Sequence, residues 1–362
     1  MVVGRARRDD ARTASAGAGD KQDHHEPTKF RFPDREGLRM ALTDEGIIET
    51  PGMLSRWVRL GSGAKAHYMT SGESGPAVVL LHGGIIGSSG TAGWRFMAPY
   101  LGANGFRVYC PDLPGFGLAD TASEHRPTGL ASYVDFVEEF ATALCLDRFH
   151  IAGNSMGCAN TVNYVCAHPE RVASFALIAG PVGDVAPHVT LDAKQEGQLF
   201  TFDGTPASMR KIMERIIYRG EAIGDDLIGM RTNAARAQAE SYKPIPVSLV
   251  KYVSGTSDPV EAARLTTRGR IDKCGIPGIF LYGRQDVVLP VEKGYEIEDS
   301  LPGVQFFYPD ECGHQGQTDQ PEMFNEVFLE FFRDGMVSRK TAEWAGVSDR
   351  RPELESVVEQ PR

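Results

Sequence analysis

Two kinds of apolar pattern alternate along the middle of the chain. Short runs of consecutive apolar residues are typical of buried parallel strands, and stretches with apolar residues three and four positions apart separate them. Two further short strands flank Gly61-Ser62-Gly63 and predict a hairpin before the first run. Alternation of this kind predicts a mostly parallel eight-stranded sheet with helices on both faces. The six apolar runs lie at 77–81, 107–110, 149–152, 172–179, 278–282 and 304–308.

After Gly180-Pro181 the pattern changes, and residues 182–269 contain no convincing strand. Thr205-Pro206 is typical of a helix start, with threonine as the cap and proline in the first turn. Apolar residues then recur with helical spacing from Met209 to Ile217, and a second helix is predicted from Asp225. We therefore expect a helical cap inserted after the sixth strand.

These patterns divide the chain into five parts. Residues 55–181 and 270–335 form the predicted α/β core, and 182–269 form the predicted cap. Residues 1–28 show no apolar period and are predicted to be a disordered tail. Residues 29–54 are predicted to be an irregular arm, and 336–362 a loosely attached C-terminal tail.

Composition narrows the range of functions. The net charge of −10 and the absence of a concentrated basic face argue against nucleic-acid binding. No apolar run approaches the about 20 residues of a membrane helix, and the N-terminus lacks a secretory signal. The six cysteines show neither C-x-x-C pairs nor zinc-ligand spacing. We expect a cytoplasmic protein with free thiols, no metal and no cofactor, acting on a small molecule.

Gly153-Asn154-Ser155-Met156-Gly157 lies between a predicted strand and a predicted helix, as a G-x-S-x-G nucleophile elbow does. The motif alone is weak, because a serine nucleophile needs a base and an orienting acid. Asp286 and His314 each follow a predicted strand, in the chain order serine, acid, histidine. The carboxyl ends of parallel strands meet at one edge of a sheet. The sequence thus predicts catalytic Ser155, Asp286 and His314.

Two further assignments depend on loops. Asp184 also follows a strand and is the alternative acid, whereas Asp310 and Glu311 are interpreted as surface charges. An oxyanion hole needs backbone N–H groups beside the nucleophile. We expect the N–H of Met156 and one N–H from Gly83 or Gly84 to form it, with His82 stabilising that loop.

Residues 55–335 resemble the α/β-hydrolase superfamily, and look most like the hydrolases that cleave meta-ring-fission products of aromatic and steroid degradation. Four stretches carry the resemblance: 80–84, 153–157, 283–286 and 312–314. It implies a cofactor-independent serine hydrolase that cleaves a carbon–carbon bond in an acidic vinylogous diketone. It also implies a homodimer or a higher homo-oligomer.

The resemblance further implies substrate-binding residues. Arg231 in the predicted cap would bind the substrate's carboxylate end, with Asn154 assisting beside the nucleophile. Gln315 is the third expected substrate-binding residue, and it stands where the family usually has tryptophan. Near the expected pocket, Ile85-Ile86 also replaces a Gly-Pro pair, and Cys158 replaces a common glycine. Two other functions stay open: a carboxylesterase or lactonase with the same three residues, and a ligand receptor without turnover.

Overall fold

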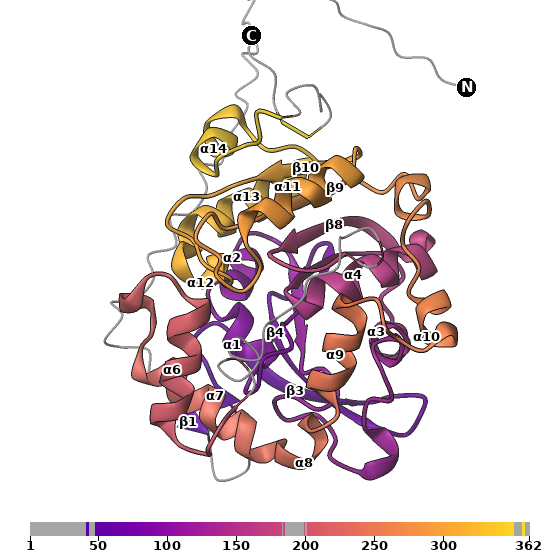
Figure 1. Ribbon diagram of the computed structural model, residues 1–362, viewed down its shortest axis with the longest axis vertical. Coiled ribbons are helices and arrows are strands. Elements are labelled where there is room, and N and C mark those ends of the chain that lie inside the picture. The colour runs from indigo at the N-terminus through magenta and orange to yellow at the C-terminus, as the bar shows by residue number, and fades with distance from the viewer. Residues whose placement is uncertain are drawn as a thin grey trace, which may run out of the picture.

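The computed structural model describes residues 41–42, 48–182, 184, 199, 201–350 and 357–358. Its main sheet has eight strands in the order β10-β9-β8-β7-β5-β6-β4-β3. Figure 1 shows β10, β9 and β8 towards one end of the molecule and β4 and β3 towards the other. The pairs β3–β4 and β4–β6 are antiparallel and the other neighbours are parallel. The predicted fold is confirmed. The strands are β3 Leu54–Arg59, β4 Lys65–Ser71, β5 Ala77–Leu81, β6 Arg107–Pro111, β7 Phe149–Asn154, β8 Val172–Ile178, β9 Gly278–Leu281 and β10 Val304–Phe307.

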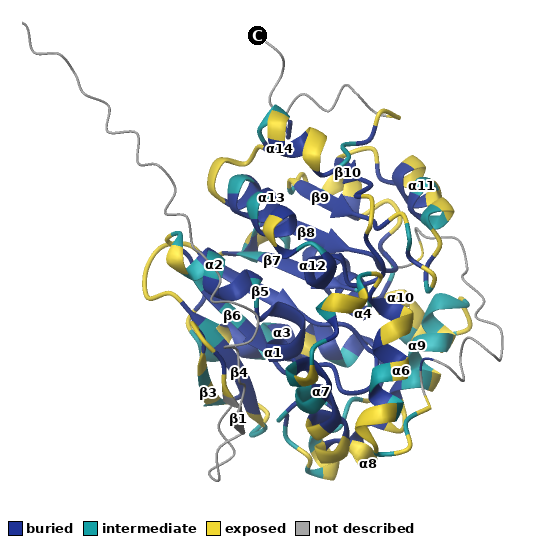
Figure 2. Cartoon of the chain, turned by 90° about the vertical axis from the view of Figure 1, so that its left-hand side faces the viewer, coloured by how far each residue is buried: buried dark blue, intermediate teal, exposed yellow. Residues whose placement is uncertain are grey.

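Each face of the sheet has its own apolar core. Successive residues of a strand point to opposite faces. In β5, Val78 and Leu80 pack with α2 (Met97–Ala103) and α13 (Pro321–Asp334), whereas Val79 and Leu81 pack with α3 (Ala131–Ala143) and α4 (Met156–Ala167). Figure 2 shows the central strands dark blue between these helices, whereas most residues of the edge strand β3 are exposed. The central strands therefore form a buried platform for the loops at their ends.

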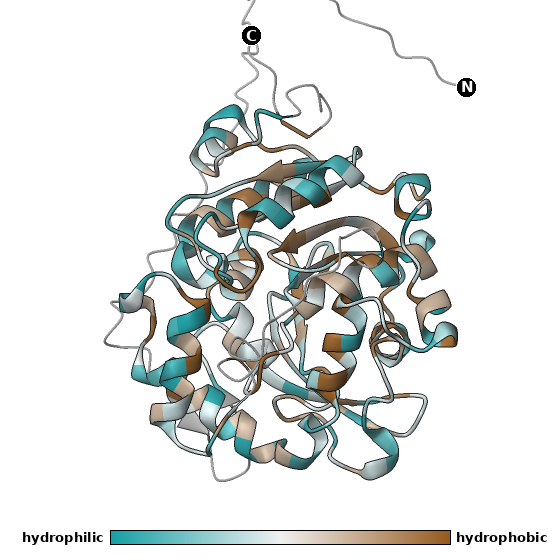
Figure 3. Cartoon of the chain, in the orientation of Figure 1, coloured by the Kyte–Doolittle hydropathy of each residue, from teal (hydrophilic) through white to brown (hydrophobic). Residues whose placement is uncertain are grey.

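The residues predicted to form the cap lie between β8 and β9. Their helices are α6 Pro206–Ile216, α7 Asp225–Ala237, α8 Ala239–Tyr242, α9 Ile245–Val253 and α10 Pro259–Arg264. The predicted start of α6 is confirmed, because the Thr205 hydroxyl accepts the N–H of Ser208. Its apolar stripe from Met209 to Ile216 is buried, and Figure 3 shows both hydropathy colours on this helix.

The prediction of a loose tail after Gly335 is wrong for the residues that the structure describes up to 350. Helix α14 (Arg339–Trp344) packs against α13, with Val337, Ala342 and Ala345 fully buried. Val347 bridges Phe307, so this segment covers the edge strand β10. Three small apolar residues within a polar run suffice to anchor it, although they form no clear hydrophobic stripe in the sequence.

The N-terminal predictions fall largely outside the described residues. The predicted tail at 1–28 lies wholly outside them. Within the predicted arm at 29–54, β1 (Ala41–Leu42) pairs antiparallel with β2 (Ile48–Glu49). Across the described parts of the chain, no helix is long and apolar enough to cross a membrane, and no cluster of side chains could hold a metal ion.

A buried hydrogen-bonded chain joins the antiparallel side of the sheet to a loop after β6. The Ser55 hydroxyl lies 2.8 Å from His67 Nε2, and His67 Nδ1 lies 2.7 Å from Asp112 Oδ2. Asp112 also accepts the N–H groups of Gly90 and Leu118, each at 2.7 Å. Burial opposes the charge of Asp112, yet the His67 ring holds the pKa of this carboxyl below its ordinary value. We interpret this chain as a structural brace.

Candidate active site

Ser155 occupies a strained turn between β7 and α4. Its φ of +56° and ψ of −121° are unusual for a residue with a side chain. A Cβ at Gly153 would lie 2.0 Å from the Gly157 carbonyl oxygen, and one at Gly157 would lie 2.3 Å from the Leu81 carbonyl oxygen. Both positions must therefore be glycine. The turn holds the serine at the end of a buried strand and at the start of a helix.

Ser155, His314 and Asp286 form one hydrogen-bonded chain. His314 Nε2 lies 2.8 Å from Ser155 Oγ, and His314 Nδ1 lies 2.7 Å from Asp286 Oδ2. The other Asp286 oxygen accepts the N–H groups of Val288 and Leu289, at 2.8 and 2.9 Å. In this geometry a neutral imidazole can take the serine proton, and the buried carboxylate can stabilise the imidazolium that forms.

The alternative acids lie elsewhere. Asp184 accepts the N–H groups of Thr267 and Arg268, both at 2.8 Å, and so fixes the segment after α10. Asp310 accepts a hydrogen bond from the Gln285 amide, and Glu311 pairs with a cap arginine. Of the acids considered, Asp286 is the one in contact with His314.

The loop after β5 lies directly on the serine. A Cβ at Gly83 would lie 3.1 Å from Ser155 Cβ, and one at Gly84 would lie 2.9 Å from Met156 Sδ. Met156 is the first residue of α4, where backbone N–H groups have no partner inside the helix. The structure thus brings all three predicted oxyanion-hole residues next to Ser155.

Two side chains fix the carbonyl groups of this loop. His82 Nδ1 donates to the Gly83 carbonyl oxygen at 2.8 Å, and His82 Nε2 accepts the Leu113 N–H at 3.0 Å. Burial lowers the pKa of His82 to about 4, so a neutral ring with one donor and one acceptor fits this arrangement. The Tyr242 hydroxyl donates to the Gly84 carbonyl oxygen at 3.0 Å. Because the carbonyl and N–H of a trans peptide point in opposite directions, the Gly83 bond also orients the Gly84 N–H.

Ser155 and His314 open into a small cavity of about 50 Å³, which we call the first chamber. Its other lining residues are apolar, and come from the Gly84 loop, the cap and the loop after β9: Ile85, Met156, Pro181, Leu199, Leu249, Val250, Val253, Val288 and Leu289. An apolar wall beside a nucleophile favours binding of a hydrocarbon portion of a substrate.

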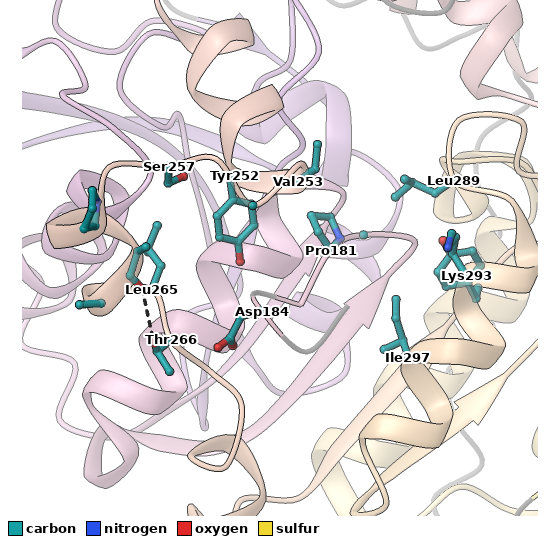
Figure 4. A pocket seen from close by; sticks show the side chains of 16 residues that line it. Pro181, Asp184, Tyr252, Val253, Ser257, Leu265, Thr266, Leu289, Lys293 and Ile297 are labelled. Carbon is teal, nitrogen blue, oxygen red and sulfur yellow. Dashed lines mark hydrogen bonds between the residues drawn. The ribbon is translucent and has the colours of Figure 1, made fainter. Parts of the chain in front are cut away.

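A larger cavity of about 510 Å³, the second chamber, shares Pro181, Val253 and Leu289 with the first. Figure 4 shows its walls coming from the end of β8, from α9 and from α11 (Val291–Ser300). Its lining is also mostly apolar, with Tyr252, Ser257, Thr266 and Lys293 among the polar residues. The two chambers together offer room for a group much larger than an acetyl.

Arg231 on α7 is 1% exposed and lies against the loop that follows Gly84. A Cβ at Gly87 would lie 2.4 Å from the backbone carbonyl oxygen of Arg231. One guanidinium nitrogen donates to Ser88 Oγ at 3.3 Å, and Nε has no hydrogen-bond partner. Burial, together with nearby Arg95, lowers the pKa of Arg231 to about 9, so the side chain is still a cation at neutral pH. No carboxylate of the described residues pairs with it.

The remaining predicted substrate contacts have other partners. The Asn154 amide donates to the carbonyl oxygens of Ile178 and His314, both at 3.0 Å, so its two N–H groups brace the histidine loop. Gln315 is buried, its N–H donates to the Ile216 carbonyl, and its side-chain oxygen has no partner. Gln315 therefore retains an acceptor for a ligand, whereas the Asn154 N–H groups are occupied.

Two residues near the site carry no signal in the sequence. Tyr242 reaches Gly84 across 158 positions, and Asp319 accepts the N–H of Gly313 beside the histidine. A single tyrosine in a helical stretch and a single aspartate in a short polar run match no motif. Their contacts depend on how the cap lies on the core.

Comparisons with known proteins identify chains that are similar to this one. A family model described as the alpha/beta hydrolase fold matches residues 76–211. A 2-hydroxy-6-oxononadienedioate/2-hydroxy-6-oxononatrienedioate hydrolase of Burkholderia vietnamiensis is 26% identical over 300 residues, covering 79% of this chain and 98% of the relative. A 2-hydroxy-6-oxo-6-phenylhexa-2,4-dienoate hydrolase of Burkholderia cepacia is 28% identical over 279 residues, covering 76% and 93%.

Solved structures show the same fold. A meta-cleavage product hydrolase from Pseudomonas fluorescens matches with a TM-score of 0.66 at 23% identity, covering 77% of this chain and 98% of that chain. A 2-hydroxy-6-oxo-6-phenylhexa-2,4-dienoate hydrolase from a Rhodococcus species matches with a TM-score of 0.63 at 26% identity, covering 78% and 99%. The resemblance seen in the sequence motifs thus extends over about three quarters of the chain.

Proposed function

We propose that this chain, which has the α/β-hydrolase fold, is a serine hydrolase that cleaves a carbon–carbon bond in an acidic ring-fission product. The substrate class is a vinylogous diketone formed when an aromatic or steroid ring is opened. The hydrogen-bonded chain of Ser155, His314 and Asp286 supports the hydrolytic part of the proposal. The substrates after which the two Burkholderia relatives are named support the substrate class.

The observation that carries the proposal is the charge of Arg231. A fully buried cation is rare without a partner, because removing the charge from water costs several kcal/mol. Here Ser88 gives it one hydroxyl oxygen, and its charged neighbour Arg95 repels it. An anionic ligand group would offset both penalties. An acidic substrate would therefore compensate this buried charge, and a neutral ester would not.

In the mechanism that follows, Arg231 and Ser88 hold the carboxylate end, and the dienol first tautomerises to a ketone. His314 Nε2 takes the proton of Ser155, or of a water molecule, as that oxygen attacks the ketone carbon. The N–H groups of Met156 and Gly84 receive the negative oxygen. The carbon–carbon bond then breaks, its electron pair passes to the carboxylate-bearing fragment, and His314 returns the proton to that carbon. Where Ser155 was the attacking group, a water molecule activated by His314 then hydrolyses the acyl-enzyme, which releases the acid product and restores Ser155.

Replacing the nucleophile tests the proposal most directly. We expect Ser155→Ala to lower turnover of a coloured ring-fission product by at least about a thousandfold, because the nucleophilic hydroxyl is lost. The measurement is the decay of substrate absorbance under single-turnover and steady-state conditions. Ser55→Ala is the matched control, since Ser55 also contacts a histidine, and it should retain activity. Wild-type turnover by Ser155→Ala would refute the assignment.

Neutralising Arg231 tests the substrate class separately. Arg231→Met should lower kcat/KM for the acidic substrate by about tenfold to a hundredfold, the value of a charge-assisted hydrogen bond, and leave a neutral p-nitrophenyl ester unaffected. Arg236→Met is the control, because Arg236 lies on the same helix and is exposed. Equal losses on both substrates would show that Arg231 supports the structure and does not bind the carboxylate.

A second function is favoured by one observation. Apart from Ser155, the only polar residue lining the first chamber in the described part of the chain is His314. A carboxylesterase or lactonase for apolar acyl groups would use this chamber without Arg231. Hydrolysis of p-nitrophenyl esters, together with no decay of ring-fission products, would establish this alternative.

A further inference from the structure

The backbone around His314 is held at three consecutive residues. The Gly313 N–H donates to Asp319 Oδ2 at 2.8 Å, and the His314 carbonyl oxygen accepts the Asn154 amide at 3.0 Å. The Gln315 N–H donates to the Ile216 carbonyl oxygen at 3.0 Å. Asn154 belongs to the core, whereas Ile216 is the last residue of α6 in the cap. The histidine loop is thus fixed from the core and from the cap.

Asp319 extends this connection to a second point on the cap. It ends the short helix α12 (Gly316–Asp319) and is 1% exposed. Its Oδ1 accepts the N–H of Arg219, which follows α6, at 2.8 Å. One carboxylate therefore joins the residue before His314 to the cap. The contact is close, because a Cβ at Gly313 would lie 3.0 Å from the Tyr218 nitrogen and 3.1 Å from the Ile216 carbonyl oxygen.

We propose that Asp319 is a positioning residue that couples the location of the cap to the orientation of His314. The inference rests on the proposed role of His314 as the base. If the end of α6 moved away from the core, the Arg219 N–H and the Ile216 carbonyl would move with it. Gly313 and Gln315 would lose their fixed partners, and the imidazole between them would leave its place between Ser155 and Asp286. Ser155 is then activated by His314 only while the cap packs against the core.

The charge of Asp319 serves this role at a cost to stability. Burial raises the pKa of this carboxyl to about 6, although the N–H groups of Arg219 and Gly313 favour its ionised form. A pKa raised in the folded state means that the group stabilises the fold when protonated, and that this contribution is lost as the pH rises through about 6. The other charged or titratable groups that act on it are the Arg219 guanidinium and the Cys312 thiol.

Asp319→Asn separates positioning from stability. The amide resembles the protonated carboxyl, so the variant should melt within about 2 °C of wild type at pH 7, or above it. The amide of this variant turns its own NH2 group towards one of the two backbone N–H groups, those of Gly313 and Arg219, so only the other N–H keeps an acceptor. We expect fluorophosphonate labelling of Ser155 to slow about tenfold to a hundredfold, as a misplaced catalytic group would cause. Asp310→Asn is the matched control. Asp310 lies in the loop between β10 and His314, its side chain is exposed, and it accepts a hydrogen bond from Gln285 of the core instead of the cap.

The pH dependence gives a second readout. Between about pH 7 and about pH 5 the wild-type labelling rate should fall more steeply than that of Asp319→Asn, because Asp319 gains a proton in this range and the amide cannot. Asp319→Glu keeps the charge and should recover part of the lost rate. Labelling of Asp319→Asn at the wild-type rate would overturn the proposal. A slower labelling of this variant that is accompanied by a matching fall in its melting temperature would overturn it as well.

Labelling requires only a reactive serine, so it remains informative if ring-fission products prove not to be substrates. Amide hydrogen exchange supplies a readout that is independent of activity. In Asp319→Asn the amides of Gly313 and Arg219 should exchange faster than in wild type, and equal protection would count against the proposed coupling. A wild-type protein that does not label would refute His314 as the base, and the exchange rates would still decide whether Asp319 joins the cap to the loop.

Discussion

In the proposed function, Arg231 is the residue that would distinguish this site from a general ester-hydrolysing site. Its neighbours supply a hydroxyl and a second guanidinium but no carboxylate of the described residues. The resemblance to ring-fission hydrolases pointed to this arginine. Helical periodicity alone would have placed it at the surface, since an arginine on a helix is usually solvated. Its complete burial was not predictable from the sequence, because it depends on the packing of α7 against the loop after Gly84.

The titration of Arg231 should be visible in substrate binding. Burial and Arg95 favour the neutral form, so the side chain is a cation below about pH 9 and loses its charge above it. An anionic substrate binds the cation, hence KM for a ring-fission acid should rise about tenfold per pH unit above that pH. The KM for a neutral ester, measured on the same enzyme up to about pH 10, should stay constant. An equal rise for both substrates would indicate a general loss of structure.

The three residues of the hydrogen-bonded chain were accessible from the sequence for a simple reason. Ser155, Asp286 and His314 each follow a strand, and parallel strands place those ends side by side. The oxyanion-hole residues follow from the same rule. Asn154 was assigned to the substrate, and the structure shows its amide N–H groups bonded to the backbone. Residue type and position therefore locate a side chain more reliably than they identify its hydrogen-bond partner.

At the scale of elements, α9 controls the size of the site. Its last residue, Val253, lies where the two chambers meet, and the adjoining Tyr252 faces the second chamber (Figure 4). The sequence predicted a helical insertion here but gave no boundary between chambers, because that boundary joins residues from the cap to the loops after β8 and β9.

Narrowing this boundary should change substrate choice. Val253→Trp adds an indole between the chambers and should lower kcat/KM about tenfold or more for p-nitrophenyl esters with long acyl chains, while p-nitrophenyl acetate is unaffected. The comparison is a chain-length series on wild type and variant. Val247→Trp on the same helix is the control, because Val247 is exposed. An unchanged series would show that substrates do not enter the second chamber.

At the scale of the whole molecule, the C-terminal segment closes one side of the sheet. Strand β10 is an edge strand, and the N–H of Ser348 donates to the Phe306 carbonyl oxygen at 2.9 Å. An uncovered edge is a template for pairing with another chain. The polar composition after Gly335 concealed this role, since the few buried residues involved are small.

Removing this segment should therefore destabilise the fold and promote self-association. Truncation after Gly335 exposes the surface that Val337, Ala342 and Ala345 cover, a loss of roughly 3 kcal/mol. We expect the melting temperature to fall by at least about 5 °C, with aggregation on light scattering. Truncation after Val358 keeps α14, the Phe306 contact and the pairing of Val337 with Val357 and Val358, and should behave as wild type. A truncation at Gly335 that melts normally would mean that the segment adds nothing to the core.

Within the residues that the structure describes, serine, histidine and aspartate side chains follow one another by hydrogen bonds in two places. In both hydrogen-bonded triplets, Ser55-His67-Asp112 and Ser155-His314-Asp286, the serine–histidine distance is 2.8 Å and the histidine–aspartate distance is 2.7 Å. Ser55, however, lies in an extended edge strand, whereas Ser155 lies in a strained turn at a helix N-terminus. A search of structures by side-chain distances alone would return two active sites in one protein. Backbone geometry separates a nucleophile from a brace, so a reliable signature of this chemistry must include the main chain.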